Sequence, residues 1–162
     1  MRALVIVGVA VWLWWAMPPA AAVDLHHFWD QRCGGCHGHA GEFARRYLKV
    51  ESGKLVGRHH TDNLRLFLGQ HEMSGAIADE IYAMLLAQAS TAPVYQEKCR
   101  SCHQNAAELA RSSLVANGAT VVGRQSGRPL ADFLPSHARL TADELSVLVE
   151  SLTRVYREVH GQ

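Results

Sequence analysis

Methionine, cysteine and excess charge are all scarce in this chain. Methionine occurs only at positions 1, 17, 73 and 84 of the 162 residues, so residues 91–162 contain none. The 16 lysines and arginines nearly balance the 15 aspartates and glutamates, so the chain lacks the basic excess by which proteins bind nucleic acid. The four cysteines all lie in two Cys-x-x-Cys pairs. A disulfide within such a pair would close only a tiny loop, so these pairs are typical of redox exchange or ligand attachment rather than of stabilisation.

The first 22 residues are predicted to be a secretory signal peptide. A positive start at Arg2 precedes an uninterrupted apolar run over residues 3–16, and small residues lead to an expected cut before Val23. With its prolines and alanines the apolar stretch reaches about 20 residues, so it could also remain as an uncleaved membrane anchor. In both cases the rest of the chain would be exported, and we expect a bacterial periplasmic location.

The remainder of the sequence is a tandem duplication. A shift of 66 residues aligns its two halves, and 15 of the 39 positions in 33–71 are identical to their counterparts without a gap. The identities include a Cys-x-x-Cys-His motif in each half, a Val-Gly-Arg triplet ending at Arg58 and Arg124, and the pair His71 and His137. We therefore predict two domains, over residues 23–90 and 91–162.

Apolar spacing predicts the same helical order in both halves. A stripe at helical spacing runs from Ala40 to Leu48 and recurs from Ala106 to Leu114, and we expect its helix to begin at or just before the motif. Very short strand-compatible segments around Val56 could form a small hairpin. Two short and two long helices complete the prediction: 62–68, 129–134, 79–88 and 141–158. Pro129 suits a first helical turn, and Thr141 with Glu144 forms a capping-box pattern. The predicted fold class is all-α.

The two motifs are the strongest functional signal. Cys33, Cys36 and His37 in the first half, and Cys99, Cys102 and His103 in the second, have the spacing of c-type haem attachment. On one helical turn the two cysteines face the same way and can form thioethers to one haem, while the histidine presents its imidazole to the iron. A thioredoxin-like pair would need a strand-to-helix junction, and a zinc site of four cysteines would leave both histidines unexplained.

On these motifs the sequence resembles the dihaem c-type cytochromes built from two small class I-like domains, over essentially the whole chain after residue 22. The resemblance implies two covalently bound haem c groups, a helix carrying each motif, a loop that delivers the sixth iron ligand, and a C-terminal helix packed across the first. That family ordinarily uses a methionine as the sixth ligand. Here the second half has no methionine, and the counterpart of Met73 is Arg139. Met84 lies on an apolar helical stripe and is expected in the core.

Two sets of histidines recur between the halves, and we predict that all four bind iron. His37 and His103 are the expected proximal ligands, and His71 and His137, in the loop before the last helix, the expected distal ligands. Met73 is an alternative ligand for the first haem, His59-His60 could serve as a reserve, and the distal histidines could be exchanged between domains.

Two pairs of arginines also recur between the halves, but they are weaker functional signals than the histidines. Arg58 and Arg124 are candidate partners of the haem propionates, because the planar guanidinium suits a carboxylate. Arg45 and Arg111 are more simply explained by pairing along the helix with Glu42 and Glu108.

A haem with two firm axial ligands has no open site for a substrate, so we predict one-electron transfer between exported or membrane-bound partner proteins. Bis-histidine ligation favours the ferric state and a low potential. The alternatives are a haem enzyme or sensor with an open or displaceable distal site, reacting with peroxide, nitrogen oxides or a gas, and an electron-transfer subunit of a larger enzyme. No acid-base pair or activated nucleophile stands out besides the motifs.

Overall fold

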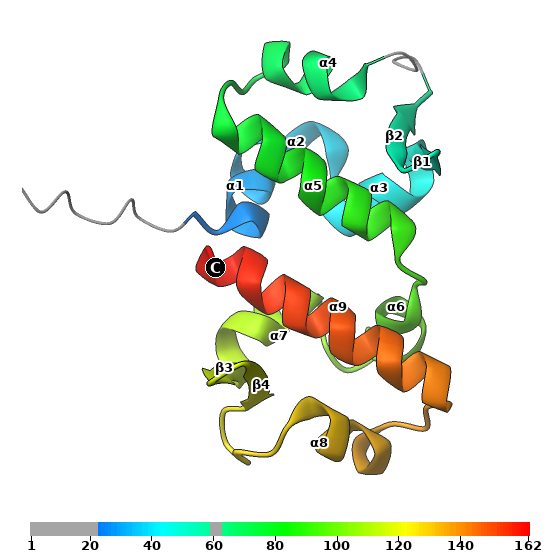
Figure 1. The fold of residues 1–162 in the computed structure, drawn as a ribbon, viewed down its shortest axis with the longest axis vertical. Coiled ribbons are helices and arrows are strands. Elements are labelled where there is room, and N and C mark those ends of the chain that lie inside the picture. Colours follow the sequence, from blue (N-terminus) through cyan, green and yellow to red (C-terminus); the bar gives the residue numbers. More distant parts are fainter. Residues whose placement is uncertain (1–22, 59–62) are drawn as a thin grey trace, which may run out of the picture.

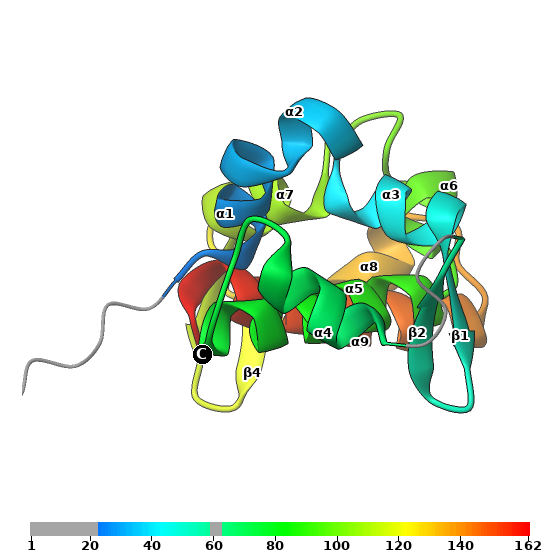
Figure 2. The ribbon, with the colours of Figure 1, turned by 90° about the horizontal axis from the view of Figure 1, so that it is seen from above.

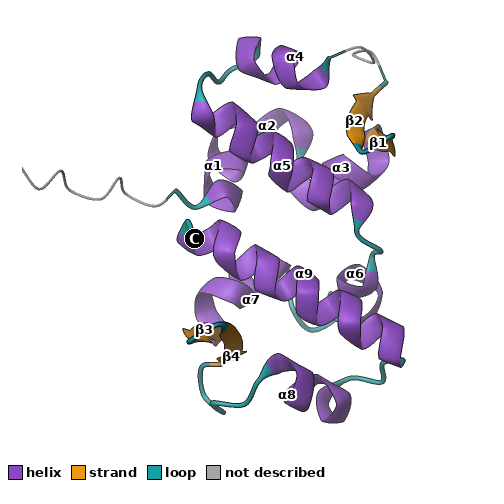
Figure 3. Ribbon diagram, viewed as in Figure 1, coloured by secondary structure: helices purple, strands orange, loops and turns teal. Residues whose placement is uncertain are grey.

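The computed structural model describes residues 23–58 and 63–162. The predicted signal peptide, and the candidate reserve ligands His59 and His60, lie outside these ranges. Within them the chain is mostly helical, with nine helices and four short strands (Figures 1 and 3). None of these helices combines the length and the apolar character that crossing a bilayer demands.

The two halves repeat one order of elements, except that α2 has no counterpart among the helices of the second half. The first half contains α1 (Leu25–Arg32), α2 (Gly34–His37), α3 (Ala40–Tyr47), β1 (Leu48–Glu51), β2 (Lys54–Gly57), α4 (Leu64–Gln70) and α5 (Ala76–Ser90). The second contains α6 (Val94–Lys98), α7 (Ala106–Ser113), β3 (Leu114–Asn117), β4 (Thr120–Gly123), α8 (Leu130–His137) and α9 (Ala142–His160). Residues 91–93 link α5 to α6.

The all-α prediction holds only in its coarser form, because each half also contains a two-stranded antiparallel hairpin. Leu48 pairs with Gly57 in the first hairpin, and Leu114 pairs with Gly123 in the second. The long helices hold the hairpins in place: the hydroxyl of Tyr82 accepts from the Leu55 amide, and that of Tyr156 from the Ala116 amide, both at 3.0 Å.

The prediction of one helix running from the motif through the apolar stripe is wrong. Helix α1 precedes the motif, where the Asp24 side chain caps it by accepting from the His27 amide at 2.8 Å. The chain then breaks at Gly38, whose φ of 67° and ψ of −158° favour glycine almost exclusively, and α3 begins separately at Ala40. In the second half, the Asn105 side chain caps α7 by accepting from the Glu108 amide at 2.7 Å, whereas α3 has no side-chain cap.

The capping box at the start of α9 is confirmed. The Glu144 amide donates to the Thr141 hydroxyl at 3.2 Å, and the Thr141 amide donates to the Glu144 carboxylate at 2.8 Å. Pro129 occupies the N-cap position of α8 rather than its first turn.

Buried apolar side chains form two separate clusters, one in each half. The first includes Trp29, Ile81 and Met84, so Met84 is a core residue as predicted. The second is built around Leu148 and Leu152 of α9. In Figure 1 the halves lie one above the other, with α4 and α8 at opposite ends and the two hairpins on opposite sides. Seen from above, α5 and α9 lie on one side of the molecule and α2 on the other (Figure 2).

Polar contacts join the two halves. The guanidinium of Arg111 on α7 donates from Nε and Nη2 to the two carboxylate oxygens of Asp24, at 2.7 and 3.0 Å. The imidazole of His26, which is 9% exposed, lies 2.7 Å from the Glu158 carboxylate on α9. Glu108 also pairs with Arg111 along α7 at 3.5 Å, as predicted, whereas Glu42 forms its ion pair with Arg100.

Candidate functional site

Both Cys-x-x-Cys-His motifs fold into one helical turn with the same backbone bonds. The His37 amide donates to the Cys33 carbonyl at 2.9 Å, and the His103 amide donates to the Cys99 carbonyl at the same distance. The second cysteine of each motif donates to the same carbonyl at 3.1 Å. Each motif therefore brings its two thiols and its imidazole onto one turn of backbone. None of the four cysteines is in a disulfide.

The first cysteine of each motif has a raised thiol pKa. Burial raises the pKa of the Cys33 thiol, with a smaller contribution from Glu72, and burial also raises the pKa of the Cys99 thiol. Reactive cysteines of disulfide-exchange proteins typically show the opposite shift, because the thiolate is the nucleophile. In the part of the chain that the structure describes, no three cysteine, histidine or acidic side chains gather closely enough to hold a metal ion by themselves.

The two repeated histidines of each half face each other. The ring centroids of His37 and His71 are 6.3 Å apart, and those of His103 and His137 are 6.1 Å apart. A metal–imidazole bond is about 2.0 Å long and the bonded nitrogen lies about 1.1 Å from its ring centre, so imidazoles on opposite sides of one metal ion have centroids about 6.2 Å apart. Both pairs therefore have the spacing that a single metal ion between them requires.

A phenylalanine one helical turn earlier holds the ring of His71 and that of His137. Phe67 stacks on His71 with centroids 4.9 Å apart, and Phe133 stacks on His137 with centroids 4.8 Å apart. These pairs are four residues apart in sequence, which places both rings on one helix face. The two phenylalanines are also related by the 66-residue shift, but that identity alone did not point to this positioning role.

The ring of His37 is also packed by aromatic side chains. Phe43 meets His37 edge to face at 4.7 Å, and Trp29 lies 6.1 Å from it while its indole Nε1 donates to the Gly38 carbonyl at 2.7 Å. Tyr95, the counterpart of Trp29, is buried in the second half.

A cavity of about 860 Å³ in the second half connects the facing histidines with the cysteines. Apolar side chains from four elements line it: Leu109, Leu114, Leu130, Phe133, Leu134 and Leu152. Polar residues on and after β4, among them Arg124, Gln125 and Ser126, line another part of it. The volume lies within the range of about 300–1,000 Å³ of small-molecule and cofactor pockets, and the mainly apolar lining suits a flat apolar group.

The two candidate propionate partners differ in their surroundings. Arg124 lines the cavity, and its guanidinium donates to three backbone carbonyls at the end of α7, those of Ser112, Arg111 and Leu114, at 3.0 to 3.2 Å. Arg58 directly follows β2 and is exposed. Arg124 therefore has a structural role that the repeat pattern did not reveal, since it ties the hairpin to α7.

The remaining candidate ligand, Met73, is half-buried and packs against the apolar cluster of the first half. Comparison with protein-family models, with curated proteins and with solved structures found no match for this chain. The residues of the two sites therefore carry the functional assignment alone.

Proposed function

We propose that the protein is an exported dihaem c-type cytochrome that carries single electrons, with one cytochrome c-like domain in residues 23–90 and another in 91–162. The observation that carries the proposal is the repeated geometry: in each half two imidazoles face each other at the spacing for one iron ion, beside two cysteines on one helical turn.

Cys33 and Cys36 would hold the first haem through thioethers, and His37 and His71 would bind its iron. Cys99 and Cys102 would hold the second haem in the same way, and His103 and His137 would bind its iron. Haem supplies one-electron chemistry at its iron, and two firm histidine ligands favour the ferric state and leave no open position for a substrate.

The surrounding side chains orient the ligands and exclude water. Phe67 and Phe133 restrict rotation of the distal imidazoles by stacking on them. The leucines of the second-half cavity provide a low-dielectric wall, which stabilises the less charged state of a buried redox group. Arg124 and Arg58 are the proposed partners of the propionates. The partner proteins are a donor and an acceptor in the periplasm or at its membrane.

Covalent attachment is the first test. The full chain is produced in a periplasm equipped for cytochrome c maturation, and its mass and haem content are measured after denaturation. We expect two haems that remain bound to the unfolded chain, and one after Cys99→Ala and Cys102→Ala are combined. An unmodified polypeptide mass from a host that matures a control cytochrome would refute the proposal.

Axial ligation is tested by carbon monoxide binding to the dithionite-reduced protein. The unaltered protein should show no spectral change, whereas His137→Ala should bind carbon monoxide at about half of its haem, because one of two irons loses a ligand. His71→Ala should behave alike at the other iron. His27→Ala, which alters an exposed histidine without a repeat counterpart, is the control.

Two outcomes would change the assignment. If Met73→Ala opens the first iron and His71→Ala does not, then Met73 is the ligand of that haem. If the unaltered protein binds carbon monoxide readily, a reactive or sensing haem replaces the electron carrier.

A further inference from the structure

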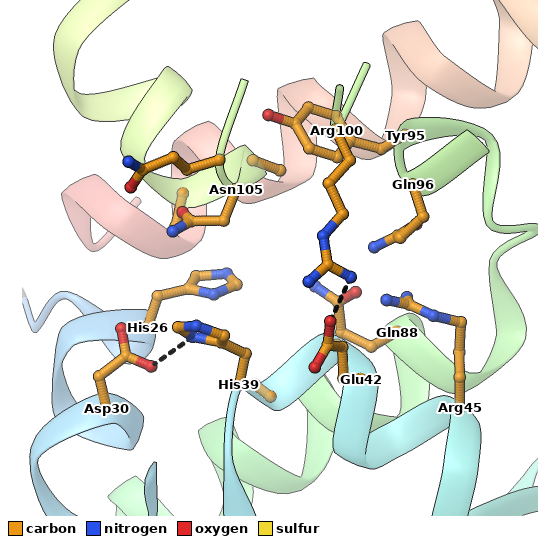
Figure 4. A pocket seen from close by; sticks show the side chains of 15 residues that line it. His26, Asp30, His39, Glu42, Arg45, Gln88, Tyr95, Gln96, Arg100 and Asn105 are labelled. Atoms are coloured by element: carbon orange, nitrogen blue, oxygen red, sulfur yellow. Dashed lines mark hydrogen bonds and ion pairs between the residues drawn. The ribbon is translucent and has the colours of Figure 1, made fainter. Parts of the chain in front are cut away.

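A second cavity lies between the two halves, separate from both facing histidine pairs. It has a volume of about 440 Å³ and is lined by the start of α3 on one wall and by residues of α6 and the start of α7 on the other. In Figure 4 the guanidinium groups of Arg45 and Arg100 enter it from opposite walls, with the amide of Gln88 between them. We name this cavity the inter-half cleft.

Arg45 is the cation of the cleft that lacks a carboxylate partner. Arg100 forms an ion pair with Glu42, but no carboxylate among the described residues lies within ion-pair distance of Arg45. Arg45 contacts an amide instead. With the Gln96 amide oriented so that its nitrogen donates to the Pro93 carbonyl, its oxygen accepts from Arg45 Nη2. Arg45 is half-buried, and burial lowers its pKa, as does the neighbouring Arg100, while Glu42 partly offsets the shift.

The duplicated half shows what such an arginine binds. Arg111 is the counterpart of Arg45, and it holds the Asp24 carboxylate across the boundary between the halves through two hydrogen bonds. By the same 66-residue shift the counterpart of Asp24 is Ser90, which has no carboxylate. The chain therefore supplies a carboxylate to one arginine of the repeated pair and not to the other.

The rest of the cleft wall offers one additional hydrogen-bonding group. Tyr95 lines the cleft, but its hydroxyl is shielded from solvent and points away from the two guanidinium groups in Figure 4, so it does not serve a ligand there. Gln88 is 9% exposed and also lines the cleft, with its amide between the two guanidinium groups. A buried amide normally forms hydrogen bonds, so a ligand on Arg45 would find a second polar partner in Gln88.

Gly41 keeps the space beside Arg45 open. A Cβ atom at this position would come within 3.0 Å of Arg45 Nη2 and 3.1 Å of Gln88 Oε1. The counterpart of Gly41 in the second half is Ala107, so the smaller residue is found on the side where the arginine lacks a carboxylate.

We infer that the inter-half cleft binds a small organic carboxylate, whose head group takes the place on Arg45 that the Asp24 side chain takes on Arg111. Arg45 forms the bidentate ion pair, and Gln88 is within the same cleft for a second polar group of the ligand. Because Arg100 is already paired with Glu42, and Asp30 also lines the cleft, one carboxylate is the charge that the cleft accommodates. The inference does not depend on the proposed haems.

Isothermal titration calorimetry of the full mature protein with succinate, in a buffer free of other carboxylates, tests the site. We expect one binding site per chain. Arg45→Met, which keeps the apolar stem, should weaken succinate binding by about tenfold or more, because a bidentate charge-assisted pair is lost. Gln96→Glu places a carboxylate on Arg45 without changing side-chain size, so it should also abolish binding while leaving the protein folded. Arg46→Gln, next in sequence and exposed, is the control and should bind as the unaltered protein does.

Three results would overturn the inference. Absence of succinate binding to the unaltered protein is the first, and equal binding by Arg45→Met is the second. The third is binding of inorganic phosphate in place of succinate with the same dependence on Arg45, which would replace the carboxylate by a tetrahedral oxyanion. If succinate does not bind and Arg45→Met shifts the haem potential, Arg45 is assigned to a haem propionate. If the protein carries no haem, the succinate titration still tests the cleft, because the cleft residues do not include the haem-attachment motifs.

Discussion

Replacing Asp24 by asparagine is expected to loosen the contact between the halves and to leave α1 capped. Asparagine caps a helix about as well as aspartate, so the variant isolates the ion pair with Arg111. Hydrogen bonds to charged groups contribute about 1.5–3 kcal/mol when buried, and exposed pairs about 0.2–1 kcal/mol. The Arg111 and Asp24 side chains are 29% and 24% exposed, so we place the loss between these limits, at about 1–2 kcal/mol. Asp24→Ala should lose about 1 kcal/mol more, because it also removes the cap.

The same ion pair predicts a dependence on pH with a definite sign. Burial of Asp24 raises its pKa, but the hydrogen bonds from Arg111 and from the His27 amide outweigh burial and lower the pKa below its usual value of 3.8. A lowered folded-state pKa means that the stabilisation is complete above the unfolded pKa and disappears as the pH falls through the folded one. The difference between the unaltered protein and Asp24→Asn should therefore be constant near neutral pH, begin to fall as the pH approaches 3.8, and vanish only below the lower folded-state pKa.

Urea denaturation at several pH values measures the difference, since urea is uncharged and does not screen the pair as guanidinium would. A double-mutant cycle with Arg111→Met gives the coupling energy, which should be about 1–2 kcal/mol. A coupling below about 0.3 kcal/mol, or a difference that persists in acid, would refute the reasoning.

Three further substitutions, one of them with a matched control, test the fold around the sites by the same denaturation assay. Gly38→Ala should destabilise by about 1–3 kcal/mol because of its φ of 67° and ψ of −158°, whereas Gly35→Ala, inside α2 with open space around it, should change stability by less than about 1 kcal/mol; equal effects would contradict the strain argument. Tyr156→Phe should cost about 1 kcal/mol by removing the acceptor of the Ala116 amide, and an unchanged midpoint would show that water replaces it. Leu152→Ala, 2% exposed and in the cavity wall, should cost about 2–5 kcal/mol, and a loss below about 1 kcal/mol would mean that the cavity lining does not support the core.

Much of the fold within one half could be predicted, because the duplication repeats local signals. The capping box at Thr141 and Glu144 and the core position of Met84 follow from side-chain spacing alone, and both are confirmed. The start of the helix with the apolar stripe was predicted wrongly, since the break depends on one backbone conformation at Gly38. The hairpins were foreseen only as short strand-compatible segments, because four-residue strands leave little periodicity to detect.

The ring of His37 lies close to that of His71, and the ring of His103 close to that of His137, while their binding of iron stays a prediction. The contacts between the halves were not predictable from the repeat. His26 and Glu158 are 132 residues apart and neither belongs to the repeated pattern, so only the tertiary arrangement brings them together. The Arg45 environment likewise becomes informative only when both copies of the unit are compared in space.

The three-residue link between α5 and α6 limits how far the two halves can ever travel from each other. Three residues span at most about 10 Å when fully extended, and the proline at position 93 restricts the last of them. The link is therefore a short covalent connection between the halves, whereas the Asp24–Arg111 ion pair is a non-covalent one. Even if that ion pair broke, residues 91–93 would keep the two halves together, so the covalent link sets an upper limit on the distance between the two candidate sites.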